Sequence, residues 1–428
     1  MPHLRRLGCS LLCIAAVSAA AAGADWPQWR GPKRDGLCTE TGLLKAWPAG
    51  GPKLLWKKTG LGMGYSTVAI ADGRILTMGD RGRSRSSGAQ FVIAYDLATR
   101  DELWATRVGA AQSDGPRCTP TIDGELAYAV GTGGDVVCVE TASGKLRWRR
   151  NFGRDFGGRM STSWRFSESP LVDGEKLLCT PGAADAKVVA LDKKTGKTIW
   201  KSAVPSLGRK GRSGAAYASI VAAEVDGVRQ YVQLVGKGLI GVAAKDGKFL
   251  WGYNRIANST ANIPTPVVRG SHVFCTTSYG TGAVLLELSR EGDGVRAKEV
   301  YFLPPNVFEN IHGGVVLVGD HLYAAKGHKY DHEPICIEFR TGKVVWKAPK
   351  PLGRLSCAVL YADGHLYFRY EGGTMALVEA TPEGYRLKST WKPSSGGRGR
   401  TWAHPVIHEG KLYLRHGDEL ACYDVKAP

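Results

Sequence analysis

The sequence lacks the features that mark several common classes of protein. Its ten cysteines include no adjacent pair and no Cys-x-x-Cys motif, which argues against thiol-held metal and c-type haem sites. No apolar run reaches the roughly 20 residues that a membrane-spanning helix needs. Acidic residues are also in the minority, because 39 Asp and Glu stand against 57 Lys and Arg, a formal net charge of +18.

The first 24 residues have the pattern of an export signal. Arg5 and Arg6 precede an apolar run over residues 11–22, and Ala24 ends a small-residue cleavage site. We expect cleavage after Ala24 and a periplasmic or secreted protein without a transmembrane segment. The remaining cysteines are scattered singly, mostly within apolar strand-like segments, where a thiol behaves as a small buried hydrophobe. We expect most of them to be free and buried, with a disulfide or two left open.

Tryptophan recurs at nearly constant spacing. Seven of these residues follow one another at 44 to 52 positions, apart from one gap of 95 with Tyr301 near its midpoint. A repeat of roughly 40–50 residues with several strands indicates a radial array such as a propeller. The tryptophans are Trp56, Trp104, Trp148, Trp200, Trp251, Trp346 and Trp391. We interpret them as packing residues between repeats rather than as cofactor-stacking residues.

Residues 114–153 contain one complete repeat. Inner strand 118–122 is followed by the tight turn Asp123-Gly124, and strands 125–131, 135–140 and 146–151 complete the unit. Similar turn signals occur eight times along the chain. The abundance of Gly and Pro leaves little room for helices, so we predict an all-β fold of four-stranded antiparallel blades.

The last repeat has only three strands before the chain stops. Its missing outer strand is supplied by residues 52–58, at the other end of the chain. Pairing the two termini in one blade closes the ring and leaves no exposed sheet edge. The sequence thus predicts an eight-bladed β-propeller over residues 52–428, preceded by signal peptide 1–24 and a lead segment 25–51.

The repeat phrases resemble those of the pyrroloquinoline quinone-like (PQQ-like) propeller family. Residues 188–200, with Thr-Gly-Lys before Trp200, carry the resemblance, and residues 137–148 and 335–346 repeat it. The family includes quinoprotein alcohol dehydrogenases and the non-catalytic propeller lipoprotein of the outer-membrane barrel assembly machinery. The Trp26-Pro-Gln-Trp29-Arg-Gly-Pro32 lead resembles the N-terminal segment of exported bacterial propellers. The likeness covers residues 52–428 and implies the fold, whereas activity varies among members.

The dehydrogenases of this family share further sequence features, and some of these features are missing from this chain. They resemble one another in an adjacent Cys-Cys disulfide and in a calcium site of Glu, Asn and Asp; here the cysteine pair is absent. Glu168 and Asn262 stand in comparable inner loops, but loop 308–313 offers no Asp. We expect Glu168 to pair with Arg159 or Arg165 instead. No cofactor is therefore expected, and PQQ with calcium is the alternative.

The loops between blades, together with those joining second and third strands, should form one variable face, where binding residues are typically found. This face is rich in arginine, which suits carboxylate, phosphate or sulfate. The candidate ligand-binding residues are Arg159, Trp164, Arg165, Glu168, Arg212, Tyr217, Asn262, His312, Arg354, Trp402 and His404.

His328, His332 and Glu333 are side chains of types that ligate metals. They lie in a segment between strands, which does not bring the two histidines to one face as a helix would. No metal is therefore expected. Catalytic residues are not identified, because nothing marks a nucleophile. Export disfavours nucleic acid as a partner. We expect a non-catalytic protein that binds an anionic polymer or an acidic protein surface of the cell envelope; the alternative is a PQQ-dependent dehydrogenase-like enzyme with a degenerate site.

Overall fold

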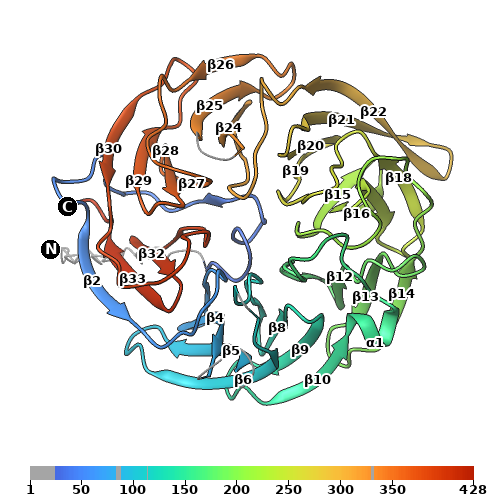
Figure 1. Cartoon of the computed structure of the whole chain (residues 1–428), viewed down its shortest axis with the longest axis horizontal. Coiled ribbons are helices and arrows are strands. Elements are labelled where there is room, and N and C mark those ends of the chain that lie inside the picture. Colours follow the sequence, from blue (N-terminus) through green and yellow to red (C-terminus); the bar gives the residue numbers. More distant parts are fainter. Residues whose placement is uncertain (1–24, 83–87, 113, 329–331) are drawn as a thin grey trace, which may run out of the picture.

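The computed structural model describes residues 25–82, 88–112, 114–328 and 332–428, so the signal sequence expected at residues 1–24 lies outside the described part. Eight sheets surround a central axis (Figure 1). Each contains four antiparallel strands; these follow the chain outward in the first seven blades, the seventh sheet has an added parallel strand, and the outer strand of the eighth comes from the N-terminal part. This arrangement confirms the eight-bladed, all-β prediction. A five-residue helix, α1 (Phe152–Phe156), caps the end of the second blade.

The first four blades span residues 69–253. Their strands are β3 (Ala69–Ala71), β4 (Arg74–Arg81), β5 (Ala89–Asp96) and β6 (Glu102–Ala110); β7 (Thr121–Asp123), β8 (Leu126–Val130), β9 (Asp135–Glu140) and β10 (Leu146–Asn151); β11 (Leu171–Asp173), β12 (Lys176–Cys179), β13 (Val188–Asp192) and β14 (Thr198–Ser202); β15 (Val221–Val225), β16 (Val228–Val235), β17 (Gly238–Ala243) and β18 (Phe249–Tyr253).

The other four blades span residues 267–424 and take two strands from the N-terminal part. They are β19 (Val267–Arg269), β20 (His272–Thr277), β21 (Gly282–Glu291) and β22 (Gly294–Leu303); β23 (Val316–Val318), β24 (His321–Lys326), β25 (Glu333–Glu338) and β26 (Val344–Lys347); β1 (Leu37–Cys38) with β27 (Cys357–Ala362), β28 (His365–Tyr370), β29 (Met375–Glu379) and β30 (Leu387–Trp391); β31 (Val406–His408), β32 (Lys411–His416) and β33 (Glu419–Asp424) with β2 (Lys53–Lys58).

The two ends of the chain meet in the eighth blade, as predicted. Strand β2 pairs antiparallel with β33, with Lys53 opposite Asp424 and Trp56 opposite Cys422. Figure 1 shows the blue β2 beside the red β33 at one edge of the ring. Because the first strand completes the last sheet, the ring closes through backbone hydrogen bonds.

The recurring tryptophans pack between neighbouring blades. Trp148 of β10 donates from Nε1 to the carbonyl of Lys193 in the third blade at 2.9 Å, and Trp104 of β6 reaches Thr141 of the second blade at 3.0 Å. Within each blade, the register between the third and fourth strands shifts once, except in the first blade, where it shifts twice. Such a bulge re-aims the side chain beside it. These contacts support the packing role expected for the tryptophans.

The lead segment crosses the axis of the ring. Trp26 forms two backbone hydrogen bonds with Ile70 of the first blade, and the carbonyl of Pro27 accepts from Ile122 of the second. Farther along, Leu37–Cys38 (β1) adds a parallel strand to the inner edge of the seventh blade. Two arginines of the segment are buried between these contacts, Arg30 and Arg34. The segment therefore joins opposite sides of the propeller.

The eight described cysteines from Cys38 to Cys422 are free and buried, as expected. Burial raises the pKa of the Cys38 and Cys138 thiols to about 12. Among the helices of the described residues, none combines the length and apolarity required to cross a membrane.

Candidate functional site: an aromatic funnel on the axis

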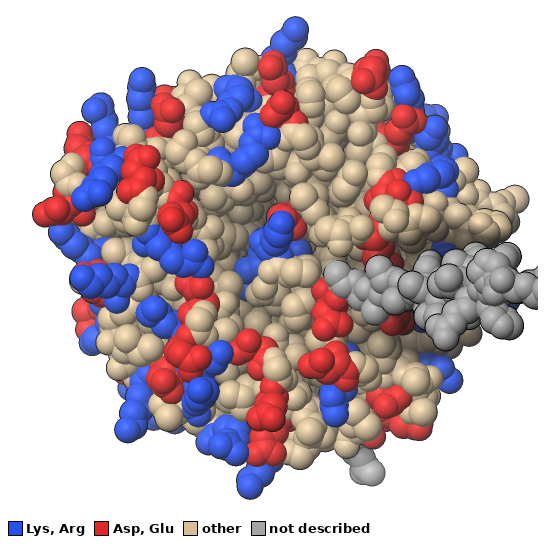
Figure 2. Space-filling view, turned by 180° about the vertical axis from the view of Figure 1, so that it is seen from behind, with Lys and Arg blue, Asp and Glu red and all other residues tan. Residues whose placement is uncertain are grey.

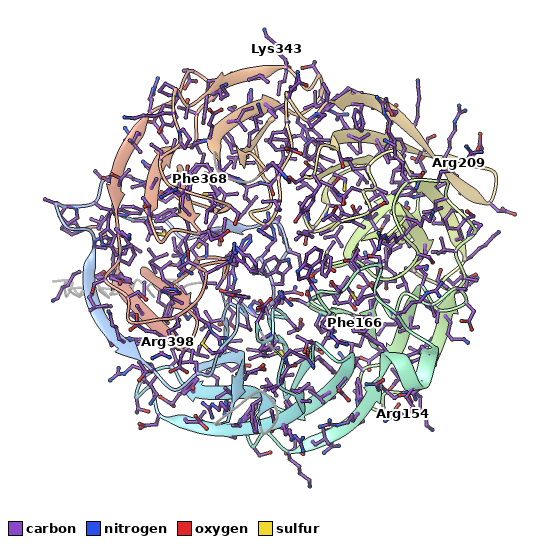
Figure 3. The ribbon with its side chains drawn as sticks, viewed as in Figure 1. Arg154, Phe166, Arg209, Lys343, Phe368 and Arg398 are labelled. Carbon is purple, nitrogen blue, oxygen red and sulfur yellow. The ribbon has the colours of Figure 1, made fainter. Side chains whose placement is uncertain are left out.

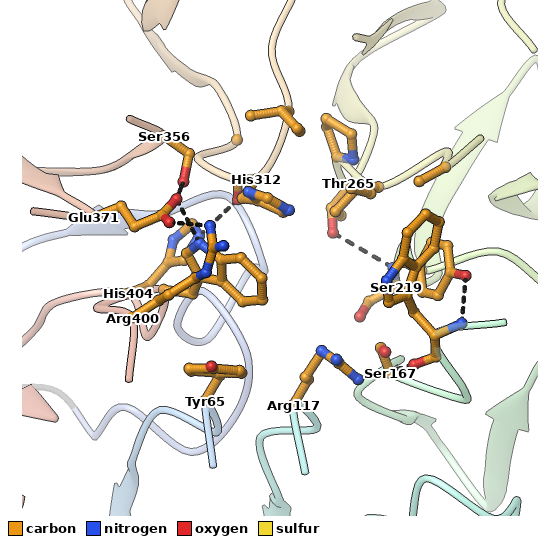
Figure 4. A pocket seen from close by; sticks show the side chains of 18 of the residues that line it. Tyr65, Arg117, Ser167, Ser219, Thr265, His312, Ser356, Glu371, Arg400 and His404 are labelled. Carbon is orange, nitrogen blue, oxygen red and sulfur yellow. Dashed lines mark hydrogen bonds and ion pairs between the residues drawn. The ribbon is translucent and has the colours of Figure 1, made fainter. Parts of the chain in front are cut away.

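A cavity of about 540 Å³ lies on the axis of the propeller (Figure 4). Its wall comes from the connections between blades and from the loops joining second and third strands, while Trp29 and Arg30 of the lead segment supply part of it. This volume is typical of pockets that enclose a small ligand. The cavity therefore marks the candidate site.

Aromatic rings form much of the wall. Trp402 lies 4.6 Å from Tyr65 and 4.5 Å from His312, measured between ring centroids. On another side, Trp164 and Tyr217 meet edge to face at 6.2 Å. Two further edge-to-face pairs, Tyr279 with His328 and Trp29 with His404, complete the set at 5.0 and 4.6 Å. The cavity is thus surrounded by rings from several blades.

Three arginines and a single glutamate line the cavity. Arg400 forms an ion pair with Glu371, whose other oxygen accepts from Trp402 at 2.8 Å and from Ser356 at 2.9 Å. Burial alone would raise the pKa of Glu371, but these hydrogen bonds and the charge of Arg400 bring it below its ordinary value. Glu371 is therefore an ionised, fully engaged carboxylate.

The other two arginines also carry charge, and Arg117 forms an ion pair with Asp114, which is not among the lining residues. Arg117 donates to the carbonyl of Trp164 at 2.9 Å and to Asp114 at 3.0 Å, and in Figure 4 its guanidinium projects into the open space. Arg30 is 4% exposed and donates to the carbonyls of Asp35 and Val315. Burial lowers the pKa of Arg30 to about 10, which still leaves it protonated at neutral pH.

Two histidines of the wall are neutral at physiological pH. Burial lowers the pKa of His312 to about 4 and that of His404 to about 3, the latter with the help of the nearby Arg30 charge. Nδ1 of His312 is buried without a hydrogen-bond partner within the described chain. With neutral histidines, the lining has more positive than negative charge and suits an anion.

The candidate residues named from the sequence divide into three groups. Five of them line the cavity: Trp164, Tyr217, His312, Trp402 and His404. Glu168 and Asn262 are buried behind the wall. The four arginines Arg159, Arg165, Arg212 and Arg354 are exposed and are not among the lining residues.

Glu168 does not pair with Arg159 or Arg165, contrary to expectation. It is 3% exposed, accepts from the backbone N–H of Thr180, and has Arg34 of the lead segment as its nearby cation. Burial raises the pKa of Glu168 to about 7 despite these favourable contacts. The cation near Glu168 therefore comes from the lead segment, and the path of this segment could not be predicted from the sequence.

Several lining residues were missed by sequence reasoning. Trp29 and Arg30 precede the first repeat, so periodicity gave no information about them, although the Trp26–Pro32 motif was noted as a resemblance. Arg117 and Glu371 lie in loops that were correctly assigned to one face but were not singled out. A recurring hydroxyl-Pro step before inner strands, at residues 119–120, 169–170 and 265–266, was an available signal.

Basic residues of the ring are not confined to the axis. Figure 3 shows Arg209 and Arg154 at the periphery, away from the central cavity. On the face turned away from the viewer in Figure 1, Lys and Arg are interspersed with Asp and Glu (Figure 2). The basic residues of the chain therefore extend beyond the cavity wall.

The eight closed blades and the axial cavity define a PQQ-like β-propeller. The chain belongs to this family: a family model described as outer membrane protein assembly factor BamB matches residues 88–348. No curated protein sequence matches the chain.

Solved structures similar to the chain include a BamB protein and alcohol dehydrogenases. BamB from Moraxella catarrhalis has a TM-score of 0.59 at 13% identity, over 87% of this chain and 99% of that one. Quinohemoprotein alcohol dehydrogenase from Comamonas testosteroni gives 0.64 at 12% identity, over 96% and 82%. A europium-containing methanol dehydrogenase gives 0.65 at 12% identity, over 92% and 90%. At these identities the likeness establishes the fold alone.

The residues present do not fit a calcium-bound quinone, the alternative that the sequence resemblance suggested. Asn262, at one position suggested for a calcium ligand, donates to the carbonyls of Val235 and Gly236 and accepts from Asn258. Glu168 is engaged behind the wall, and the only carboxylate among the lining residues is the ion-paired Glu371. No group of three metal-ligating side chains occurs in the described ranges. A calcium donor set is therefore not assembled at the cavity.

The candidate metal-binding segment, residues 328–333, includes residues 329–331, which lie outside the described part. Nδ1 of His328 shares a 2.8 Å hydrogen bond with Ser278 Oγ, and the backbone carbonyl of His332 accepts from Tyr370. His328 lines the axial cavity instead.

Proposed function

We propose that this protein is an exported, non-catalytic PQQ-like propeller that binds an anionic ligand in its axial funnel. The observation that carries the proposal is the composition of one cavity: three arginines and aromatic rings line it, with Glu371, paired to Arg400, as the lining carboxylate and Asp114, paired to Arg117, outside the lining. Rings bury a ligand's apolar surface, and guanidinium groups bind its acidic groups through paired hydrogen bonds. An acidic polysaccharide is the favoured source of such a ligand in the cell envelope.

The experiment compares binding of polygalacturonate and of neutral dextran to the full mature chain by calorimetry. Arg117→Met removes the cation that projects into the cavity, and Arg147→Met on outer strand β10 is the matched control. We expect the acidic polymer alone to bind, with at least a tenfold loss for Arg117→Met and no change for the control. Equal binding of both polymers, or equal losses in both variants, contradicts the proposal.

A separate arm tests for redox activity. The protein is incubated with pyrroloquinoline quinone and calcium, passed through gel filtration, and assayed for dye-linked alcohol oxidation. We expect no retained quinone absorbance and no turnover, because the carboxylates required for calcium are engaged elsewhere. Retention with turnover would overturn the non-catalytic assignment.

A further inference from the structure

Three buried hydroxyl groups from consecutive blade connections line one side of the cavity. Ser169 lies just before β11, Ser219 before β15 and Thr265 before β19, with exposed fractions of 2%, 3% and 8%. In Figure 4 the oxygens of Ser219 and Thr265 face the open space. We call these residues the hydroxyl row.

The oxygen of each hydroxyl already accepts a hydrogen bond from the protein. Backbone N–H groups donate from Thr119 to Ser169 Oγ at 2.9 Å, from Ser169 to Ser219 Oγ at 2.9 Å, and from Ser219 to Thr265 Oγ1 at 3.4 Å. Trp29 Nε1 donates to the same Thr265 oxygen at 3.1 Å. The connections of successive blades and the lead segment therefore hold the row in place.

Two of these hydroxyls have a hydrogen that no bond within the described protein uses. A hydroxyl carries one donor hydrogen; that of Ser169 is engaged in a side-chain hydrogen bond with Cys118, whereas no hydrogen bond donated by Ser219 or Thr265 is found among the described residues. A buried donor left without an acceptor costs free energy. Ser219 and Thr265 thus present two donors to the cavity, and they favour a ligand atom that only accepts.

Positive charge lies directly behind this row. Arg34 is 4% exposed and donates to the backbone carbonyls of Ser169 at 2.6 Å and Pro170 at 3.0 Å. The nearby carboxyl group of the buried Glu168 partly offsets the positive charge of Arg34. The electrostatic environment therefore suits one negative charge better than two.

The aromatic wall indicates the shape of the ligand. The ring pairs that bound the cavity cross at 52° for Tyr65 with Trp402 and at 66° for Trp164 with Tyr217. Each pair is a contact between neighbouring wall rings, so together the rings present faces and edges in several directions around the cavity. A puckered ring, with C–H groups in several directions, contacts such tilted rings more completely.

We infer that the hydroxyl row is an oxyanion subsite, and that its ligand is a sugar acid: a sugar ring bearing one carboxylate or sulfate ester. The acidic group accepts hydrogen bonds from Ser219 and Thr265 beside Ser169, while the sugar ring lies among the tilted aromatic rings. This inference rests on the proposed function and specifies its ligand.

Calorimetry with small probes tests the ligand class. The probes are glucuronate, glucose 6-sulfate, glucose and benzoate, each titrated into the full mature chain. We expect glucuronate or glucose 6-sulfate to bind at least tenfold more tightly than glucose and benzoate; the tighter of the two identifies the acidic group. Benzoate binding as tightly as the sugar acids would overturn the sugar assignment.

Substitutions of Ser219 test the hydroxyl row itself. A hydrogen bond to a charged group typically corresponds to about a ten- to hundredfold change in affinity, so we expect Ser219→Ala to weaken binding by that factor. Ser219→Thr keeps the hydroxyl and should restore affinity. Ser202→Ala removes a buried hydroxyl of β14 outside the cavity and is the control. Should Ser219→Ala fail to fold, Ser219→Cys replaces the donor with a weak one, and the same loss is expected.

The two proposals fail in different ways. If Ser219→Ala, or its cysteine replacement, binds sugar acids normally while Arg117→Met does not, the hydroxyl row is overturned and the anion-binding funnel stands. If the unaltered protein binds neither the sugar acids nor polygalacturonate, both are overturned.

Discussion

The indole of Trp148 packs against Gly196, which lies in the turn between the third and fourth strands of the next blade. A β-carbon added at Gly196 would stand 2.7 Å from Trp148 Cδ2, and the glycine has a φ of +70°. The recurring Trp of one blade thus packs against the recurring turn Gly of the next blade. The same pairing joins Trp104 to Gly144 and Trp200 to Gly247.

This contact predicts that Gly196→Ala destabilises the propeller. The substitution adds a steric clash to the cost of a left-handed backbone, and we expect a loss of about 2–4 kcal/mol in unfolding free energy, measured by denaturant titration. Gly174→Ala is the matched control: its φ is +59°, but no atom lies within 4 Å of the added carbon. It should lose only about 1 kcal/mol. Equal losses would show that the indole contact contributes nothing beyond the backbone.

A buried carboxyl makes stability depend on pH. Burial raises the pKa of Asp80 from 3.8 to about 6, against hydrogen bonds from Gln112 and Gln90 and the charge of Arg415. Because the folded-state pKa is the higher one, the contribution of Asp80 to stability is fully present below about pH 4. It is lost as the pH rises through 6.

Asp80→Asn should therefore stabilise the protein at pH 7.5 by about 1–3 kcal/mol, and the gain should shrink towards zero near pH 4. The amide oxygen of asparagine retains an acceptor for the backbone N–H of Gln112. Thermal melts at several pH values measure the effect. Asp72→Asn, at an exposed turn, is the control substitution, and a pH-independent difference at Asp80 would exclude titration as its cause.

The sequence predicted the ring better than the site, for a physical reason. Blade number, closure through β2 and the packing role of tryptophans such as Trp148 follow from a periodic pattern that every blade repeats. The path of the lead segment has no period, and its buried arginines are held by backbone carbonyls, which any sequence provides. Loop assignment gave the correct face for Trp402 and Arg354 alike, but side-chain direction decided that only Trp402 lines the cavity.

Peripheral arginines and the funnel should make separable contributions to anion binding. Arg209 and Arg212 lie on the connection between the third and fourth blades, are exposed, and are not part of the cavity wall. Reversing both charges, Arg209→Glu with Arg212→Glu, should lower the salt concentration that elutes the protein from heparin, because exposed charges act over about 8–10 Å at physiological ionic strength.

The same double variant should bind glucuronate with unchanged affinity, because the cavity wall is untouched and screening limits the reach of surface charge. Arg117→Met should give the opposite pattern, with nearly normal heparin elution and weakened glucuronate binding, because its guanidinium faces the cavity. Chromatography and calorimetry on the two variants provide the comparison. If the double charge reversal at Arg209 and Arg212 also weakens glucuronate binding tenfold, the anion is recognised on the exposed rim. The proposal that the axial funnel binds it is then wrong.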